Sequence, residues 1–500
     1  MSDGWLRLDR RTVLVTAVVM GAVACGAGLP ALLALAGTMP WWQALGRVVA
    51  GAALLIAVGA AADHVRWRRT RYRIGPERAE LHTGLLLTKR RSLARDRIRS
   101  VDLTADPLLR ILGLVKVRIG TGEHTGVGES TLELDPVTKE EGERLRRELL
   151  ARAQPEGPGT HREGELAVLD PRWIRYAPVS FVAPLLGGAA AGAVMQVSEW
   201  FGAQGEVIDW TVDRFRHTPV LWTAVVLALG FLAAGVVGAL GLWAEMWSNY
   251  RLEREPGGTL RVRRGLFTTR SVSIEERRLR GVELVEPLGA RLCGAARVDA
   301  VATGLVKDDD DKHADLKTLL PAAPRAVADD VVALVLREAG APTSVPLTPH
   351  PRAARTRRLR RSLGAALVAV VTLTVLGLLV TDVLLYIAAA CAPVLLTLAV
   401  LLALDAYRSL GHAMAGDYLV ARSGTVRRGT VALRRNGVIG WTLKQSWFQR
   451  RAGLLTLTAT TAAGDGAYSV YDAGEHEVLD FASLVVPGLL EPFLDRRQDL

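Results

Sequence analysis

The sequence has few of the residues that most often carry chemistry. Its 500 residues include three cysteines and nine histidines, and these lie singly, without the spacing of a metal site, an H-E-x-x-H motif or a disulfide framework. The cysteines are Cys25, Cys293 and Cys391. No phosphate loop ending in Gly-Lys-Ser/Thr and no G-x-S-x-G motif is present. The sequence therefore predicts no catalytic residues, no metal site and no cofactor, and we expect that the protein is not an enzyme.

Two short stretches resemble ligand-binding loops but lack the required pattern. The glycines of IGTGEHTGVGES, from Ile119, are not followed directly by a helical pattern, so they predict a wide hairpin turn rather than a nucleotide site. The acidic run KDDDDKHAD, from Lys307, lacks the alternate spacing and the glycine of a calcium loop. We interpret it as a solvated loop.

Apolar residues are abundant and concentrated. Half of the residues are hydrophobic and the mean hydropathy is +0.21, although 23% of the residues are charged. Six apolar stretches are each long enough to cross about 30 Å of hydrocarbon as a helix: residues 12–37, 44–62, 176–197, 219–243, 363–380 and 383–402. The sequence therefore predicts an integral membrane protein with six transmembrane helices in three hairpins.

The region after each hairpin repeats. GLLLTKRRSLARDRIRSVDL from Gly84, GLFTTRSVSIEERRLRGVEL from Gly265 and GTVRRGTVALRRNGVIGWTL from Gly424 share a glycine, a basic middle and an apolar alternation. A second glycine follows each first glycine by twenty-nine places and an arginine precedes the second glycine by three. These residues are Gly113 and Arg110, Gly294 and Arg291, and Gly453 and Arg450. An ungapped repeat of this length indicates three copies of one module.

Within a module, short runs such as VKVRI and TLEL alternate apolar and polar residues, which is typical of strands with one buried face. A helical pattern follows the strands. In the first copy we expect the helix to begin at Asp135 and Pro136 and to bury Leu145 and Leu149. The pattern predicts a small barrel or bent sheet of antiparallel strands with one C-terminal helix.

The runs TADPLLRILGLVKVRIGTG from Thr104, VEPLGARLCGAARVDAVATG from Val285 and KQSWFQRRAGLLTLTATTAAG from Lys444 resemble the bacterial pleckstrin-homology-like domain. Repeated hairpins that each precede such a domain are similar to bacterial membrane proteins of the YdbS/YdbT type. The resemblance implies an α+β membrane protein whose modules are pleckstrin-homology-like split barrels. The second copy departs from the pattern at Pro287, and the third has Trp447 where the first has Pro107.

The expected organisation alternates hairpins and modules along the whole chain. The hairpins span residues 12–62, 174–244 and 362–404, and the modules span residues 64–160, 246–342 and 405–500. Basic runs on the module side, from His64, Pro171 and Pro351, favour a cytoplasmic location of the modules and of both termini. We therefore expect a multi-pass protein of the bacterial inner membrane.

Arginine and lysine clusters in the modules are the candidate binding residues for anionic lipid headgroups or a partner. These are Lys89, Arg90, Arg91, Arg95, Arg97, Arg270, Arg277, Arg278, Arg280, Arg427, Arg428, Arg434 and Arg435. Membrane lipids are the expected partners, with another membrane protein or self-association as the alternative. Nucleic acid is not expected, because no aromatic platform is interleaved with the charges.

The predicted function is binding or scaffolding at the inner membrane surface. A six-span transporter, or an accessory subunit of a transporter, is the alternative. The apolar stretches hold almost no ionisable residues of the kind that line ion pathways, which favours the binding function.

Overall fold

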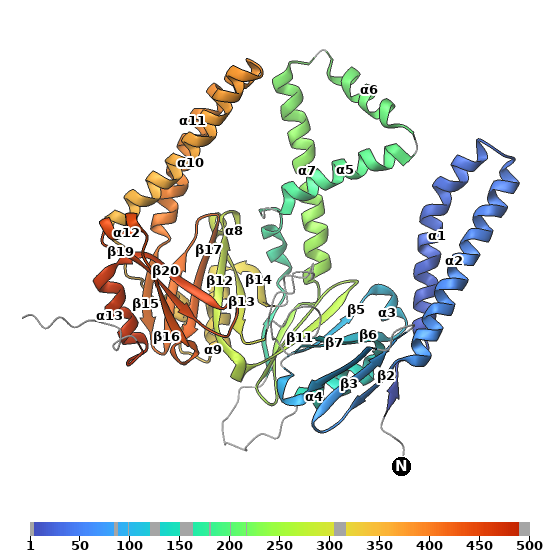
Figure 1. Ribbon diagram of the computed structural model, residues 1–500, viewed down its shortest axis with the longest axis horizontal. Coiled ribbons are helices and arrows are strands. Elements are labelled where there is room, and N and C mark those ends of the chain that lie inside the picture. The colour runs from blue at the N-terminus through green and yellow to red at the C-terminus, as the bar shows by residue number, and fades with distance from the viewer. Residues whose placement is uncertain are drawn as a thin grey trace, which may run out of the picture. The chain divides into compact units, whose positions relative to one another are not determined.

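The computed structural model describes residues 5–84, 89–98, 100–120, 131–150, 164–179, 182–200, 202–216, 218–304 and 317–489 (Figure 1). In these ranges the chain is α+β, with long apolar helices and antiparallel sheets. It divides into two compact units, residues 1–276 and residues 277–500. The predicted glycine-rich turn beyond Gly120 and the acidic run from Lys307 lie outside the described residues.

Residues 1–276 contain two antiparallel sheets. The first has the order β1 (Leu6–Arg7), β2 (Arg71–Ile74), β3 (Arg78–Thr83), β4 (Lys89–Ala94). The second has the order β7 (Thr131–Thr138), β6 (Leu114–Gly120), β5 (Ser100–Ala105), β11 (Thr269–Glu275), β10 (Thr259–Arg264), β9 (Arg251–Glu255), β8 (Gly164–Val168). The second sheet therefore joins strands of the first module to strands of the second.

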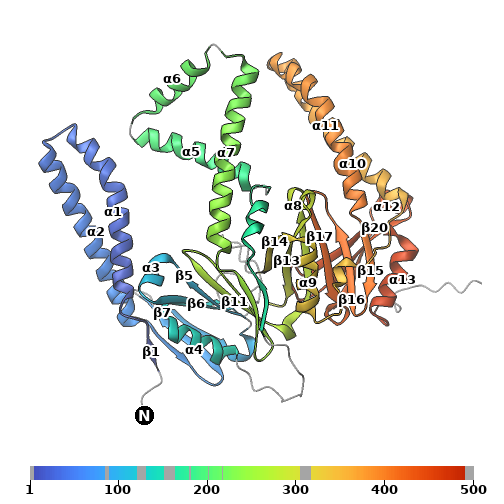
Figure 2. The same cartoon turned by 180° about the vertical axis from the view of Figure 1, so that it is seen from behind.

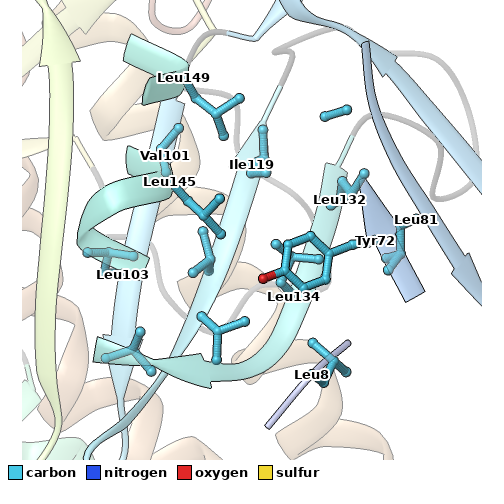
Figure 3. Close-up of a cluster of buried hydrophobic side chains, with 14 of the residues drawn as sticks. Leu8, Tyr72, Leu81, Val101, Leu103, Ile119, Leu132, Leu134, Leu145 and Leu149 are labelled. Atoms are coloured by element: carbon cyan, nitrogen blue, oxygen red, sulfur yellow. The ribbon is translucent and has the colours of Figure 1, made fainter. Parts of the chain in front are cut away.

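The core of the first module lies between its two sheets and helix α4 (Lys139–Leu150). Leu145 and Leu149 of α4 are buried against strand residues such as Val101 and Ile119, as predicted (Figure 3). The predicted helix start was wrong. Asp135 and Pro136 belong to β7, whose end pairs with β6 through Val137 and Val115, and this pairing delays the helix to Lys139.

Residues 277–500 repeat this plan. One sheet has the order β14 (Thr318–Pro324), β13 (Ala295–Ala302), β12 (Leu279–Pro287), β17 (Arg427–Arg434), β16 (Tyr418–Ser423), β15 (Gly411–Ala415), and the other has β18 (Gly440–Lys444), β19 (Leu454–Thr460), β20 (Ala467–Gly474). Helices α9 (Arg325–Leu336) and α13 (Glu475–Val485) follow the strands of the second and third modules. The six-stranded sheet, β14 to β15, joins strands of the second module to strands of the third.

Five helices in the described residues are long and apolar enough to cross a membrane. They are α1 (Thr12–Ala36), α2 (Trp41–Arg69), α7 (Val220–Trp247), α10 (Arg352–Leu379) and α11 (Val383–Arg408). The predicted six spans in three hairpins are therefore not confirmed. The remaining apolar stretch forms α5 (Val182–Trp200), and residues between this stretch and α7 form a further helix, α6 (Gln204–Phe215).

Helix α5 packs closely on α7 through small residues. A Cβ atom on Gly235 would lie 2.0 Å from the carbonyl oxygen of Ala183, and a Cβ on Gly187 would lie 2.3 Å from that of Phe231. Glycine and alanine allow such close approach of helix backbones in membranes. The α5–α7 contact therefore depends on residues that lack large side chains.

The repeat seen in the sequence corresponds to the same local structure in all three modules. A five-residue helix begins six residues before the second repeat glycine in each copy: α3 (Pro107–Ile111), α8 (Leu288–Leu292) and α12 (Trp447–Arg451). Gly113, Gly294 and Gly453 then have φ values of 70°, 69° and 61°. Glycine adopts this left-handed region without steric cost, which explains its recurrence.

The carbonyl of this glycine also receives the same hydrogen bond in each copy. The donors are the backbone N–H groups of Lys139 to Gly113, Arg325 to Gly294 and Glu475 to Gly453, over 3.0, 2.9 and 3.2 Å. Each donor is the first residue of the module's C-terminal helix. The repeat glycine thus both ends the short helix and positions the long one.

Successive modules are joined edge to edge by two strand pairs, β5 with β11 and β12 with β17. Counted from the first repeat glycine of each module, both junctions pair position 19 with position 6: Leu103 with Ser271, and Leu284 with Thr430. Both also pair position 16 with position 9: Ser100 with Ile274, and Gly281 with Leu433. The two junctions therefore have the same register.

The second junction requires a glycine. A Cβ on Gly281 would lie 2.0 Å from the carbonyl oxygen of Ala432 across the junction, whereas a Cβ on the equivalent Gly440 of β18 would meet nothing within 4 Å. We predict that Gly281→Val destabilises the protein by about 1–3 kcal/mol, because the side chain forces β12 away from β17. Thermal unfolding of the detergent-solubilised full-length protein measures this.

The matched control is Gly440→Val, which places the same side chain at the same position of the third module. It should leave the unfolding temperature unchanged. Equal unfolding temperatures for the two variants would contradict the close packing at Gly281.

Candidate membrane-surface site

Exposed apolar side chains gather on the short helices and on the loops after the first repeat glycines. We call these residues the apolar rim: Ile111, Leu266 and Phe267 in residues 1–276, and Leu292, Val426, Trp447 and Phe448 in residues 277–500. Ile111 is 82% exposed and Leu292 is 79% exposed. Such exposure of aliphatic side chains at equivalent positions of two modules indicates a surface for contact with something apolar.

In residues 1–276 the rim is attached to the ends of apolar helices. Arg11, which precedes α1, donates from Nη1 to the carbonyl oxygen of Leu112 over 2.8 Å. The carboxylate of Glu245, in the last turn of α7, accepts from the backbone N–H groups of Phe267 and Thr268 over 3.0 and 2.9 Å. Both figures of the whole chain show α3 beside the base of α1 and α2 (Figures 1 and 2). These contacts hold the rim of residues 1–276 beside the ends of α1 and α7.

The rim of residues 277–500 has corresponding attachments. Arg291 of α8 pairs with Asp405 in the last turn of α11, with 2.8 Å between Nη2 and Oδ2. Leu454, which directly follows α12 and Gly453, is fully buried against Ala354 of α10 and Leu410. Helices α8 and α12 are thereby held near the ends of α10 and α11.

The repeat arginines have different contacts in the three modules. Arg110 donates from Nη1 to the carbonyl oxygen of Leu266 in the next module's loop, and Arg291 pairs with Asp405. Arg450 is exposed, and its neighbour Arg451 lies over the ring of Trp447 at 4.8 Å from the centroid. The shared arginine thus bonds to the next module's loop in the first module and to a long apolar helix in the second, and in the third it is exposed.

A cavity of about 610 Å³ lies at the base of α1 and α2. Its lining combines four arginines with two large aromatic residues: Arg7, Arg10, Arg11, Arg144, Trp67 and Tyr72. The guanidinium carbon atoms of Arg7 and Arg10 lie 6.0 and 5.4 Å from the Trp67 ring centroid. All four arginines are exposed, and Arg11 and Arg144 also hydrogen-bond to the carbonyl oxygen of Leu112 and to Glu141, whereas Arg7 and Arg10 lie beside the Trp67 ring.

Several of the predicted basic residues form ion pairs or hydrogen bonds with other residues of the protein. Arg428 makes a two-pronged pair with Glu286 across the second junction, with both N–O distances 2.8 Å. Arg427 pairs with Glu283 over 3.1 Å, and Arg434 donates to the hydroxyl of Tyr418 over 3.0 Å. Arg95 donates to backbone carbonyl oxygens, including that of Glu148. These arginines therefore connect strands and helices of the modules.

The other predicted residues are more accessible or fall outside the described residues. Lys89, Arg90, Arg277 and Arg435 are exposed, and Arg91, Arg270, Arg278 and Arg280 are half-buried. The side chain of Arg97 lies outside the described residues, although its backbone is part of a short helix. Within each unit the described members of this set therefore differ in exposure and in contacts.

The carboxylates that face the junction arginines have shifted pKa values. Burial works to raise the pKa of Glu286, but hydrogen bonds and charge from Arg428 and Arg325 outweigh burial and hold the pKa below its ordinary range. Burial raises the pKa of Glu283, and Arg427 only partly opposes this. Glu286 therefore keeps its negative charge to a lower pH than Glu283 does.

Sequence reasoning missed a buried ion network at the first junction. Arg146 of α4 and Arg261 of β10 are 4% and 3% exposed and share the carboxylates of Glu143 and Glu255. Burial works to raise the pKa of both glutamates, yet the two arginines lower it. The sequence shows that α4 and the next module's strands both carry acidic and basic residues. It does not show which of these residues pair.

Comparisons with known proteins agree with this architecture. The family model described as "Bacterial PH domain" matches residues 13–153 and 361–485, more than half of the chain. Over 437 residues the chain is 23% identical to UPF0699 transmembrane protein YdbT of Bacillus subtilis (strain 168), covering 83% of this chain and 85% of that protein. No solved structure matches. The second module lies outside the matched ranges, but its strands and helices follow the same order.

We predict that Arg428→Ala lowers stability while Arg435→Ala does not. Arg428→Ala leaves the buried carboxylate of Glu286 without its two-pronged partner, at a cost of about 2–4 kcal/mol, whereas Arg435 is exposed. Thermal unfolding of the full-length protein distinguishes the two variants. Equal effects would show that Arg428 acts only as a surface charge.

The stabilisation by this pair depends on pH through Glu286. Since the folded-state pKa of Glu286 lies below its ordinary value of 4.5, the pair contributes fully above that value and its contribution is lost as the pH falls through the lowered pKa. The difference in unfolding temperature between wild type and Glu286→Gln should therefore shrink below about pH 4.5.

Proposed function

This chain belongs to the bacterial PH domain family and carries transmembrane helices, and we propose that it is a non-enzymatic binding and scaffolding protein at the cytoplasmic surface of the bacterial inner membrane. The observation that carries the proposal is the attachment of the apolar rim to the ends of apolar helices on both units. Neither the family description nor the name of the Bacillus subtilis relative mentions an enzymatic activity.

The proposed topology has six spans in three hairpins, with the modules and both termini in the cytoplasm. Support for the sixth span comes from α5, a 19-residue helix that packs on α7 through small residues. Support for the orientation comes from the basic residues that end α2 and begin α10, such as Arg66, Arg68 and Arg355, because short cytoplasmic segments are enriched in arginine and lysine.

The proposed ligands are anionic lipid headgroups. The rim would place Ile111, Phe267, Leu292 and Phe448 among the headgroups, where exposed apolar and aromatic side chains are favoured. Exposed cations beside them would attract phosphate groups, each contributing about 1 kcal/mol near the surface. The cavity beside Arg7, Arg10 and Trp67 is the proposed position for a headgroup.

We predict that Arg7→Ala/Arg10→Ala weakens binding of anionic lipid by about fivefold or more, since two charges are removed. The measurement is competition of anionic against zwitterionic lipid for the full-length protein in mixed nanodiscs, at low and high salt. The charge-matched control is Arg214→Ala/Arg216→Ala, which removes two exposed arginines near the end of α6. If both double variants behave alike, the cavity is not a lipid site.

Labelling of the native Cys293 can test on which side of the membrane the modules lie. This cysteine is exposed at the end of α8, beside Leu292 of the rim, whereas Cys25 and Cys391 lie within apolar helices. A membrane-impermeant thiol reagent should label inside-out vesicles and leave right-side-out vesicles unlabelled, and Cys293→Ser should abolish the signal. Labelling of right-side-out vesicles instead would place the modules outside the cytoplasm.

A further inference from the structure

Strand β18 of the third module pairs on one side only among the described strands, with β19. Its equivalents in the first two modules, β5 and β12, pair on both sides, because the next module supplies β11 or β17. The chain therefore builds this edge-to-edge junction twice and presents the same strand edge a third time, at β18, where no described strand pairs with it.

The complementary edge is present at the other end of the chain. Strand β4 of the first module is equivalent to β11 and β17, and among the described strands it pairs only with β3. A second copy of this chain therefore offers the strand type that β18 lacks. An unpaired strand edge is a template for pairing with another chain.

The details of β18 match those of a junction strand. Gly440 stands at position 16 after Gly424, where β12 has the Gly281 that lets β17 approach, yet a Cβ on Gly440 would meet nothing within 4 Å. Ile439 and Leu443, at the same edge, are 63% and 42% exposed. Strand β18 thus has both the glycine that would allow a neighbouring strand to approach and exposed apolar side chains. No described strand of the same copy covers them.

We propose that β18 of one copy pairs with β4 of a second copy, antiparallel, in the register of the two internal junctions. This register places Leu443 opposite Arg90 and Lys444 opposite Lys89. Counted from the first repeat glycine of each module, position 19 then faces position 6 and position 20 faces position 5. The proposal is independent of lipid binding, since it depends on backbone pairing and not on the rim or the cavity.

The junction between β5 and β11 leaves the long apolar helices of residues 1–276 on one side of the sheets. In residues 1–276, α1, α2 and α7 all leave the sheets on the same side in both views, although they precede two different modules (Figures 1 and 2). A second copy joined in the same way keeps its helices in the same membrane. Such a head-to-tail contact joins copies into rows or rings.

A pair of like charges makes the contact between copies weaker than the internal junctions. Lys444 faces Lys89 in the proposed register, and like charges directly opposite on two strands are destabilising. The corresponding internal pairs are Thr104 with Arg270 and Val285 with Gly429, which bring no two cations together. The association is therefore weak in the wild type and sensitive to these two charges.

The first test is a charge cycle on the full-length protein in detergent and in nanodiscs, with oligomeric state measured by mass photometry over a range of concentrations. Lys89→Glu alone and Lys444→Glu alone should each tighten association by about three- to tenfold, because repulsion becomes attraction. The double variant should return to the wild-type value. The exposed Lys139→Glu is the control and should change nothing. A double variant tighter than either single variant, or monomers throughout, overturns the proposal.

The second test uses Gly440→Val, whose side chain meets nothing within the single copy. In the Lys89→Glu background it should abolish association while the unfolding temperature stays unchanged. Undiminished association would overturn the pairing through β18. Lipid competition should be unaffected in either case, which separates failure of this proposal from failure of the proposed lipid binding.

The third test fixes the register by cross-linking. In a background without native cysteines, a chain with Leu443→Cys and a differently tagged chain with Arg90→Cys should form a mixed disulfide, since directly opposite residues lie within disulfide reach. The diagonal combination of Leu443→Cys with Ser92→Cys should cross-link far less. A disulfide between two Leu443→Cys chains at equal yield would show that β18 pairs with itself and would overturn the proposed partner strand.

Discussion

Backbone pairing between successive modules is the constraint on which the rest of this structure depends. Strands β5 and β12 each lie inside a sheet whose other half comes from the following module. The described strands of the second module are divided between two sheets: β8 to β11 extend the first module's sheet, and β12 to β14 extend the third module's sheet. Such shared sheets bury edges that isolated small modules would leave exposed. The division of the chain after Glu276 follows from this sharing.

Arginines of this chain lie in two environments that differ in burial. Arg146, Arg261 and Arg428 are paired with carboxylates at the junctions, where their planar guanidinium groups can bind two oxygens at once. Arg7 and Arg10 lie exposed over Trp67 at the base of α1. A high arginine content near membrane spans therefore does not by itself indicate lipid binding, since part of it holds neighbouring modules together.

The periodicity of the sequence predicted the repeated elements well. It did not predict which strands pair between modules. The apolar residues nine and fourteen places after the first repeat glycine of each module are buried: Leu93, Ile98, Ile274, Leu279, Leu433 and Val438. The start of α4 was misplaced because capping signals are local and β7 continues through them to satisfy β6. The apolar rim was missed because a short helix with a single exposed isoleucine or leucine resembles any other turn.

Five long apolar helices, the repeated modules and the glycines that recur in them could be read from the amino-acid order, because hydrophobic length, periodicity and left-handed backbone act within a few residues. Tertiary structure was needed to establish which strands pair between modules, which arginines form internal ion pairs and where the apolar side chains stand relative to the helix ends. Strand pairing and ion pairing join residues more than a hundred places apart, and neither leaves a periodic signal in the chain.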